Sequence, residues 1–122
     1  MINKIRKADK KIMEFKYCKL EIFIPETKIL ELQKALQKVD AGHIGNYDSC
    51  MSVSQVTGYW RPLDGCDPYI GENGKISSEP EAKVEVTIYA EAVERTIQAI
   101  KEVHPYEEPV INAIPIWKTS FL

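Results

Sequence analysis

The chain has 122 residues, of which 44% are hydrophobic and 28% are charged, and its formal net charge is −2 at pH 7. These proportions are typical of one soluble globular domain, and no apolar run approaches the roughly 20 residues that a membrane-spanning helix needs. The N-terminus lacks the apolar stretch of a secretory signal peptide. The three cysteines are widely spaced and form no C-x-x-C pair, which argues against a disulfide framework or a zinc knuckle. We therefore expect a cytoplasmic protein.

The charge is unevenly spread along the chain. Residues 1–16 hold six Lys/Arg against two Asp/Glu, whereas the remainder holds ten Lys/Arg against sixteen Asp/Glu. We therefore expect a basic N-terminal arm over residues 1–16 and one domain over residues 17–122. A basic arm can contact nucleic acid or an anionic membrane, but a terminal segment of this kind is more often a solvated tail. Because the body is acidic, we expect neither nucleic acid nor a membrane as a partner.

The first predicted elements are a strand and a helix. Apolar residues alternate over residues 17–24, which predicts a half-buried strand that ends at Pro25. Apolar residues then recur at helical spacing up to about Asp40, and Gly42 marks the end of the helix. The residues on this helical stripe are Ile29, Leu32, Leu36 and Val39.

The same pattern returns 64 residues later in the chain. Residues 83–88 align with residues 19–24, and the following helical positions stay in phase without a gap, from Ile29 with Val93 to Val39 with Val103. We interpret this match as an internal duplication of a strand–helix unit.

Each predicted helix leads through a turn into another strand. The turn over residues 42–47 precedes a strand over residues 50–57, and the turn over residues 104–109 precedes a strand over residues 110–117. The order β-α-β-β-α-β predicts an α+β fold of the ferredoxin-like, split βαβ type. Its sheet has four antiparallel strands, with the first strand of each unit at the centre and both helices on one face.

The segment over residues 58–82 is too long for an ordinary hairpin loop. We expect a long hairpin between the second and third strands, in which Tyr59, Trp60 and Arg61 extend the second strand beyond the sheet. Long loops inside compact domains are often functional, and aromatic and arginine side chains are common anchors at interfaces. This segment is therefore a candidate interaction loop, with Tyr59, Trp60, Arg61 and Tyr69 as its contact residues.

The turn His104-Pro105-Tyr106-Glu107-Glu108-Pro109 concentrates polar side chains between two prolines, which fix φ near −65°. Imidazole and carboxylate groups are ligands for zinc and copper, so His104 and Glu107 are candidate ligands of a divalent metal, Cu or Zn. The alternative is structural, with His104 capping the preceding helix and Tyr106 in the core.

Several of these motifs carry a resemblance to known proteins. The stretch His104-Pro105-Tyr106-Glu107, followed by a strand that ends in Ile114-Pro115, resembles the C-terminal signature of CutA, the divalent-cation-tolerance proteins. The motifs over residues 42–47 and 61–74 resemble more closely the CutA/PII-like domain inserted in dinuclear-metal hexameric proteins of the YqfO type. The resemblance covers residues 17–117.

This resemblance implies a stand-alone PII/CutA-like module, and such modules are typically trimers. In PII signalling proteins, the loop between the second and third strands contacts partners, and small ligands lie in clefts between subunits. The corresponding loop here is residues 58–82, in which no PII nucleotide-binding motif is recognisable. YqfO-type proteins carry their two-metal site in the flanking halves, so that chemistry is not transferred to this chain.

The two histidines cannot share one site within a subunit. In the predicted topology, the His43 turn and the His104 turn lie at opposite ends of the sheet, ~25 Å apart for strands of seven or eight residues. A site that uses both turns therefore needs two subunits. For a ligand in such a cleft, the candidate binding residues are His43, Asn46, Arg61, Tyr106 and Glu108.

No catalytic motif is present, so we do not expect an enzyme. The sequence favours a trimeric binding or sensor module for a small ligand or divalent metal, or one that docks on a partner protein through residues 58–82. The alternative is a structural or assembly domain with no ligand of its own. The homotrimer is expected to bury the sheet face opposite the helices, which carries Phe23, Thr87, Tyr89 and Trp117.

Overall fold

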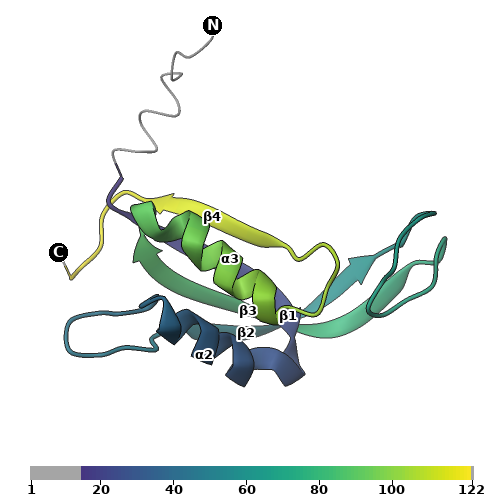
Figure 1. Ribbon diagram of the computed structural model, residues 1–122, viewed down its shortest axis with the longest axis horizontal. Helices are drawn as coiled ribbons and strands as arrows, with labels where there is room; N and C mark the ends of the chain where they lie inside the picture. The colour runs from purple at the N-terminus through teal and green to yellow at the C-terminus, as the bar shows by residue number, and fades with distance from the viewer. Residues whose placement is uncertain (1–14, 122) are drawn as a thin grey trace, which may run out of the picture.

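The computed structural model of the protein describes residues 15–121 (Figure 1). The predicted basic arm lies almost wholly outside the described residues, so its separation from the domain stays a prediction. The elements in chain order are β1 (Tyr17–Pro25), the 3-10 turn η1 (Glu26–Lys28), α2 (Ile29–Lys38), β2 (Ser52–Trp60), β3 (Ser77–Tyr89), the 3-10 turn η2 (Ala90–Ala92), α3 (Val93–Val103) and β4 (Ile111–Ile116).

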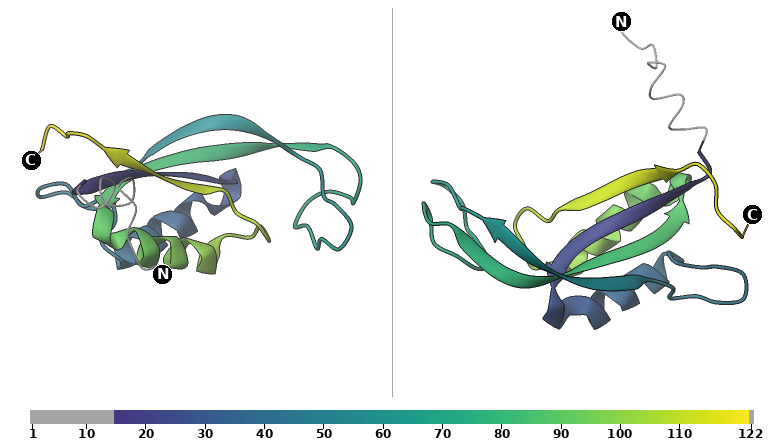
Figure 2. Two further views of the ribbon diagram at one scale, coloured as in Figure 1. Left: turned by 90° about the horizontal axis from the view of Figure 1, so that it is seen from above. Right: turned by 180° about the vertical axis from the view of Figure 1, so that it is seen from behind.

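The four strands form one antiparallel sheet in the order β2-β3-β1-β4. The first strand of each unit, β1 or β3, is central, and both helices cover the same face (Figure 2). This arrangement confirms the predicted ferredoxin-like α+β fold. Neither helix of the described chain has the length and apolar character that crossing a membrane requires.

The core lies between the sheet and the two helices. Alternate residues of β1 and β3 point toward the helices and are buried, whereas their neighbours face the other way. Full burial of a Leu, Ile or Val side chain contributes roughly 1.5–3 kcal/mol, so this core fixes the helices and the turns at their ends. Its largest fully buried apolar side chains are Leu20, Ile22, Ile24, Leu32, Leu36, Val84 and Ile100.

The internal repeat is visible in the observed elements. Helix α2 begins at Ile29 and α3 begins at Val93, and the 3-10 turns before them begin at Glu26 and Ala90, so both pairs keep the offset of 64 residues. The two units meet through the antiparallel pairing of β1 with β3. The spacing of apolar residues in the sequence therefore predicted the positions of both strand–helix units.

The hairpin formed by β2 and β3 extends far beyond the helices (Figure 1). Strand β2 includes Tyr59 and Trp60, as predicted, but it ends before Arg61, which was predicted to belong to it. Because β3 begins at Ser77, the loop covers residues 61–76, and the predicted bounds of 58–82 were wrong. Pro80 obscured this strand in the sequence. It pairs with Thr57 of β2 on a part of β3 that has no β1 partner, where a missing N–H costs no ladder bond.

The sheet face opposite the helices is charged in its middle. Lys19 of β1 contacts Glu85 of β3 at 2.7 Å, and Lys83 of β3 contacts Glu21 of β1 at 3.1 Å. Phe23 and Thr87 share this face, but they flank the charged pairs rather than form a continuous apolar surface. The open face is therefore mixed, which corrects the expectation of an apolar one.

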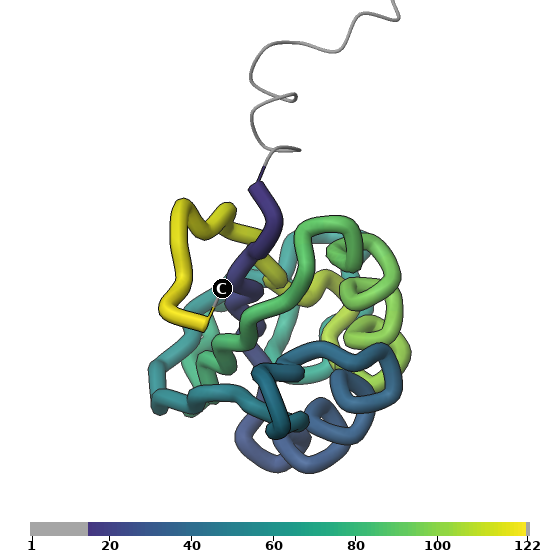
Figure 3. Tube along the Cα trace, turned by 90° about the vertical axis from the view of Figure 1, so that its left-hand side faces the viewer, coloured from purple at the N-terminus to yellow at the C-terminus, as the bar shows by residue number. Residues whose placement is uncertain are grey.

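Aromatic side chains gather at the start of β1. Tyr17 stacks on Tyr89 with 5.0 Å between ring centroids, and Phe121 meets Tyr17 edge-on at 5.4 Å. Figure 3 shows the C-terminal segment beside the start of β1. Trp117 lies just beyond β4, contacts Phe15 edge-on and is 88% exposed. It belongs to this terminal cluster rather than to the middle of the open face.

Candidate functional site

A cavity of about 420 Å³ lies where the hairpin loop approaches the turn that follows α3. Four segments build it: the end of β1, the end of β2 with the loop over residues 61–76, the start of β3, and the segment between α3 and β4. The lining is mainly aromatic and aliphatic, with four charged side chains. It consists of Phe23, Tyr59, Trp60, Arg61, Pro62, Cys66, Pro68, Tyr69, Ile70, Glu81, Tyr106, Glu107, Glu108 and Val110.

His104 attaches the turn to the central strand. The His104 N–H donates to the Ile100 carbonyl at the end of α3, while its ring lies against β1 and the turn. Nε2 is 2.6 Å from the carbonyl oxygen of Phe23, and Nδ1 is 3.2 Å from the N–H of Tyr106. A carbonyl can only accept and an amide N–H can only donate, so the ring is a neutral imidazole protonated at Nε2. Burial lowers the His104 pKa, despite the Phe23 bond and the nearby negative charge of Glu81.

Tyr106 lies at the centre of an aromatic group. Its ring centroid is 5.0 Å from that of His104, 6.0 Å from that of Tyr69 and 6.1 Å from that of Trp60. Its hydroxyl oxygen is buried and has no hydrogen-bond partner among the described residues. Burial and the neighbouring Glu81 carboxylate both raise the Tyr106 pKa, although the two groups do not meet in hydrogen-bond geometry.

The hairpin loop is held against the turn by polar bonds. The N–H of Asp67 donates to both carboxylate oxygens of Glu107, each at 3.2 Å. Within the hairpin, Trp60 Nε1 donates to the Ile70 carbonyl at 3.0 Å. These bonds join segments 40 and 10 residues apart and fix one wall of the cavity.

Glu81 places a buried carboxylate in the cavity wall. The residue is 6% exposed, yet it forms no salt bridge within residues 15–121. Its side chain lies over Gly58 of β2, where an added Cβ would overlap the Glu81 carboxylate. Gly58 thus provides the space that this carboxylate occupies.

Comparison with known proteins identifies the kind of domain. The family described as CutA1 divalent ion tolerance protein matches residues 69–121. The crystal structure of a NIF3-related protein of Bacillus cereus has a TM-score of 0.74 and 33% identity, over 85% of this chain and 26% of that chain. The chain carries a CutA-like domain.

Curated relatives agree with this CutA-like domain. GTP cyclohydrolase 1 type 2 homologs of Halalkalibacterium halodurans and Bacillus subtilis are each 36% identical, over 80% and 83% of this chain. The chain spans about a quarter of their lengths, 26% and 27%. CutA of Archaeoglobus fulgidus shares the fold, with a TM-score of 0.64 and 21% identity over 84% of this chain and 86% of that one. The predicted resemblance to CutA and to the CutA-like domain of YqfO-type proteins is confirmed.

The structure leaves His104, one of the two residues predicted to bind a divalent metal, without a free ligand atom, whereas the Glu107 carboxylate keeps free lone pairs. Both ring nitrogens of His104 are engaged, one by Phe23 and the other by Tyr106, so no lone pair is free. Both oxygens of Glu107 accept from the Asp67 N–H. Throughout the described part of the CutA-like domain, no three His, Cys, Asp or Glu side chains are grouped to hold a metal ion.

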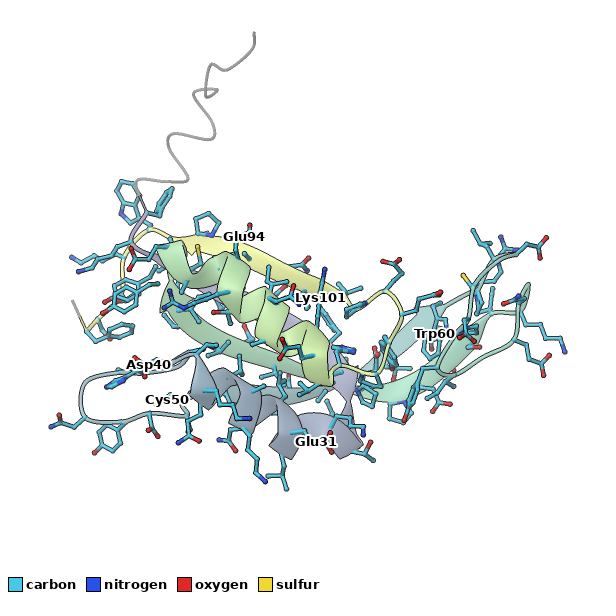
Figure 4. All side chains as sticks on the ribbon, viewed as in Figure 1. Glu31, Asp40, Cys50, Trp60, Glu94 and Lys101 are labelled. Carbon is cyan, nitrogen blue, oxygen red and sulfur yellow. The ribbon has the colours of Figure 1, made fainter. Side chains whose placement is uncertain are left out.

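His43 and Asn46 lie outside the cavity, in the turn at the other end of the sheet. Figure 4 shows this separation, with Asp40 and Trp60 at opposite ends of the molecule. His43 contacts Asp40 at 2.8 Å and the Gly45 carbonyl at 2.9 Å, and the bond to Asp40 is the main reason that its pKa is raised. The Gly42 carbonyl accepts from the Cys50 N–H, so the backbone at Gly42 lies against the end of its own turn.

The cavity brings together most of the predicted contact residues. Arg61, Tyr106 and Glu108 from the predicted ligand set line it, as do the predicted loop residues Tyr59, Trp60 and Tyr69, and the metal candidate Glu107. Sequence reasoning missed Phe23 and Glu81. A prediction that began β3 at Ser77 would have paired Glu81 with Pro25 of β1, close to the 104–109 turn. The strand register was therefore the information that could have identified Glu81 as a cavity residue.

Proposed function

We propose that this CutA-like domain binds a small ligand in the cavity between the hairpin loop and the 104–109 turn. The observation that carries the proposal is a cavity of about 420 Å³ whose walls are tied together by the Asp67–Glu107 and His104–Phe23 hydrogen bonds. Binding pockets for small molecules fall in the range of roughly 300–1,000 Å³ and are mostly apolar with a few placed polar groups. The cavity matches that description in size and lining.

The proposal includes a homotrimer, as expected for a CutA/PII-like module. The open sheet face leaves Ile114 and Tyr89 40% and 45% exposed, and the hairpin extends beyond the domain's own helices. Packing this face against other copies buries these side chains and pairs sheet edges. Light scattering at micromolar concentration is expected to give about three times the chain mass of 13.9 kDa. A clean monomer argues against any site shared between subunits.

Ligand binding is tested by a thermal-shift screen with small amines, carboxylic acids, nucleotides and divalent metals. A ligand present at 100 times its Kd stabilises the folded state by ~2.7 kcal/mol. For a compound that raises the melting temperature, Glu108→Ala in the cavity wall is expected to weaken the shift, whereas His43→Ala at the other end of the sheet leaves it unchanged. The reverse dependence places the site at the His43 turn.

A divalent metal, Cu or Zn, is the second candidate ligand, because the matching family is named for divalent ion tolerance. The described residues of one chain contain no group of three His, Cys, Asp or Glu side chains that could hold a metal ion, so we propose that such a site is assembled between subunits.

The loop over residues 61–76 is also a proposed docking surface for a partner protein, since Leu63 and Ile76 are 58% and 77% exposed. A screen that gives no shift with any compound favours a structural or assembly domain. The cytoplasmic location stays a prediction.

A further inference from the structure

Among the residues that the structure describes, Glu81 is a buried acid without a counter-charge. Its side chain lines the cavity and is 6% exposed, while the nearby Lys83 pairs with Glu21 on the open face. Burying a carboxylate without an opposite charge is costly, and such groups are ordinarily paired or hydrogen-bonded. Within residues 15–121, no Lys, Arg or His lies within salt-bridge distance of Glu81. The cavity is thus the direction from which a positive charge can reach it.

Tyr106 provides a second unsatisfied group in the same wall. Its hydroxyl is buried, lies near the Glu81 carboxylate, and has no hydrogen-bond partner in the described part of the chain. Buried hydroxyls are nearly always hydrogen-bonded. A ligand ammonium group has several N–H donors, so one such group can bind the carboxylate and the hydroxyl together.

The remaining walls also favour a cation. Aromatic rings attract positive charge to their faces, and Phe23, Trp60, Tyr69 and Tyr106 all line the cavity. The charged side chains that line the cavity are three carboxylates, those of Glu81, Glu107 and Glu108, and one guanidinium, that of Arg61. Arg61 is an exposed residue whereas Glu81 is buried, so the inner charge of the cavity is negative.

We propose that the cavity takes an organic cation, a protonated amine with an apolar or aromatic body, whose ammonium group binds Glu81 and Tyr106. This inference rests on the proposed ligand-binding function and specifies its ligand class. The aromatic walls would hold the body of the ligand, and the space over Gly58 would keep the Glu81 carboxylate at the cavity surface.

The test compares three probes that share a phenyl ring and differ in charge: 2-phenylethylamine, protonated at pH 7.5; neutral 2-phenylethanol; and anionic 3-phenylpropanoate. The chain has two tryptophans, so Trp117→Phe leaves Trp60 in the cavity wall as the fluorescent reporter. In this background, we expect the ammonium probe to bind at least tenfold more tightly than the alcohol, and the carboxylate to bind most weakly.

Two substitutions separate the proposed contact from bulk charge. Glu81→Gln is expected to reduce affinity for the ammonium probe at least tenfold while leaving the alcohol unchanged. Glu79→Gln is the matched control, because Glu79 lies on the same strand two residues away but does not line the cavity. Tyr106→Phe removes only the hydroxyl and is expected to weaken the ammonium probe severalfold. Circular dichroism verifies that each variant is folded.

Each contrary outcome overturns the inference. Equal affinity for the ammonium and alcohol probes, tighter binding of the carboxylate, or equal losses in Glu79→Gln and Glu81→Gln each exclude an ammonium contact at Glu81. In those cases a probe still binds in the cavity, so the proposed ligand-binding function stands. If none of the three probes binds, the cation proposal fails, and the thermal-shift screen decides the proposed function separately.

Discussion

The imidazole of His104 donates its Nε2 proton to the carbonyl oxygen of Phe23, 81 residues earlier in the chain, at 2.6 Å. The N–H of the same Phe23 donates to the Val110 carbonyl at 3.2 Å. One residue of the central strand therefore holds the first residue of the 104–109 turn and the residue that directly follows the turn. Because Phe23 also lines the cavity, its two backbone bonds set the distance between two cavity walls.

Loss of this imidazole is expected to destabilise the fold. His104 is 7% exposed, and His104→Ala leaves the Phe23 carbonyl without its donor and opens space beside Tyr106. We expect the free energy of unfolding to fall by roughly 1–3 kcal/mol in chemical denaturation, with or without added zinc or copper. His43→Ala is the matched control, since His43 is exposed, and we expect a change below about 0.5 kcal/mol. Equal effects of the two substitutions contradict the structural role of His104.

Stability is expected to decrease in mild acid because of the same residue. Burial lowers the pKa of His104 in the folded state, so below about pH 6.5 the unfolded chain binds a proton more readily than the folded chain. Stability from His104 is therefore present above the ordinary histidine pKa, and it is lost as the pH falls from that value through the lower pKa of the folded state. His43 acts oppositely, because its raised pKa favours the protonated folded form.

Chemical denaturation between pH 8 and pH 5 of the wild type, His104→Gln and His43→Gln distinguishes the contributions of the two histidines to acid stability. His104→Gln is expected to flatten the loss of stability in acid, whereas His43→Gln is expected to steepen it. Acid sensitivity that is unchanged in His104→Gln assigns the effect to other groups.

The fold was predictable because its apolar phase is strong and appears twice. The alternation in residues 19–24 and 83–88, and the helical stripes that begin at Ile29 and Val93, gave the order of elements and the central strand pair. The start of β3 was missed because Ser77–Pro80 pairs only with β2 and buries none of its side chains. A strand without a buried face leaves no apolar alternation to detect.

The cavity was only partly predictable. The aromatic loop and the polar turn could be recognised by composition. Their contact depends on the bond from the Asp67 N–H to the Glu107 carboxylate and on the packing of Tyr69 against Tyr106, and the sequence pattern specifies neither. Sequence does not specify which of two adjacent carboxylates accepts such a bond. The role of Glu81 depends on Gly58, across the β2–β3 ladder, so it required the strand register.

Replacing Gly58 tests whether that space is needed. An added Cβ in Gly58→Ala overlaps the Glu81 carboxylate, which then has to move. We expect a loss of roughly 1–3 kcal/mol in the free energy of unfolding, as for other overpacked sites. We also expect weaker binding of any ligand that contacts Glu81. Ser54→Ala, on the same face of β2, is the control and should change stability little. Wild-type stability and binding in Gly58→Ala would show that Glu81 has free space elsewhere.

Glu107→Gln is expected to loosen the hairpin loop without unfolding the domain. The substitution removes the negative charge that accepts the Asp67 N–H through two oxygens at 3.2 Å. A hydrogen bond of this kind contributes roughly 0.5–1.5 kcal/mol, so the Asp67 amide should exchange with solvent about 2- to 10-fold faster.

Glu108→Gln is the matched control, because it removes the same charge one residue away. No described residue contacts the Glu108 side chain by hydrogen bond or salt bridge. Amide exchange followed by NMR at pH 7 should therefore show faster exchange at Asp67 in Glu107→Gln alone. The amides of β1 should remain protected in both variants, because the central strand keeps its ladder with β3 and β4. Equal acceleration in both variants would show that loop order depends on net charge and not on the Glu107 bond.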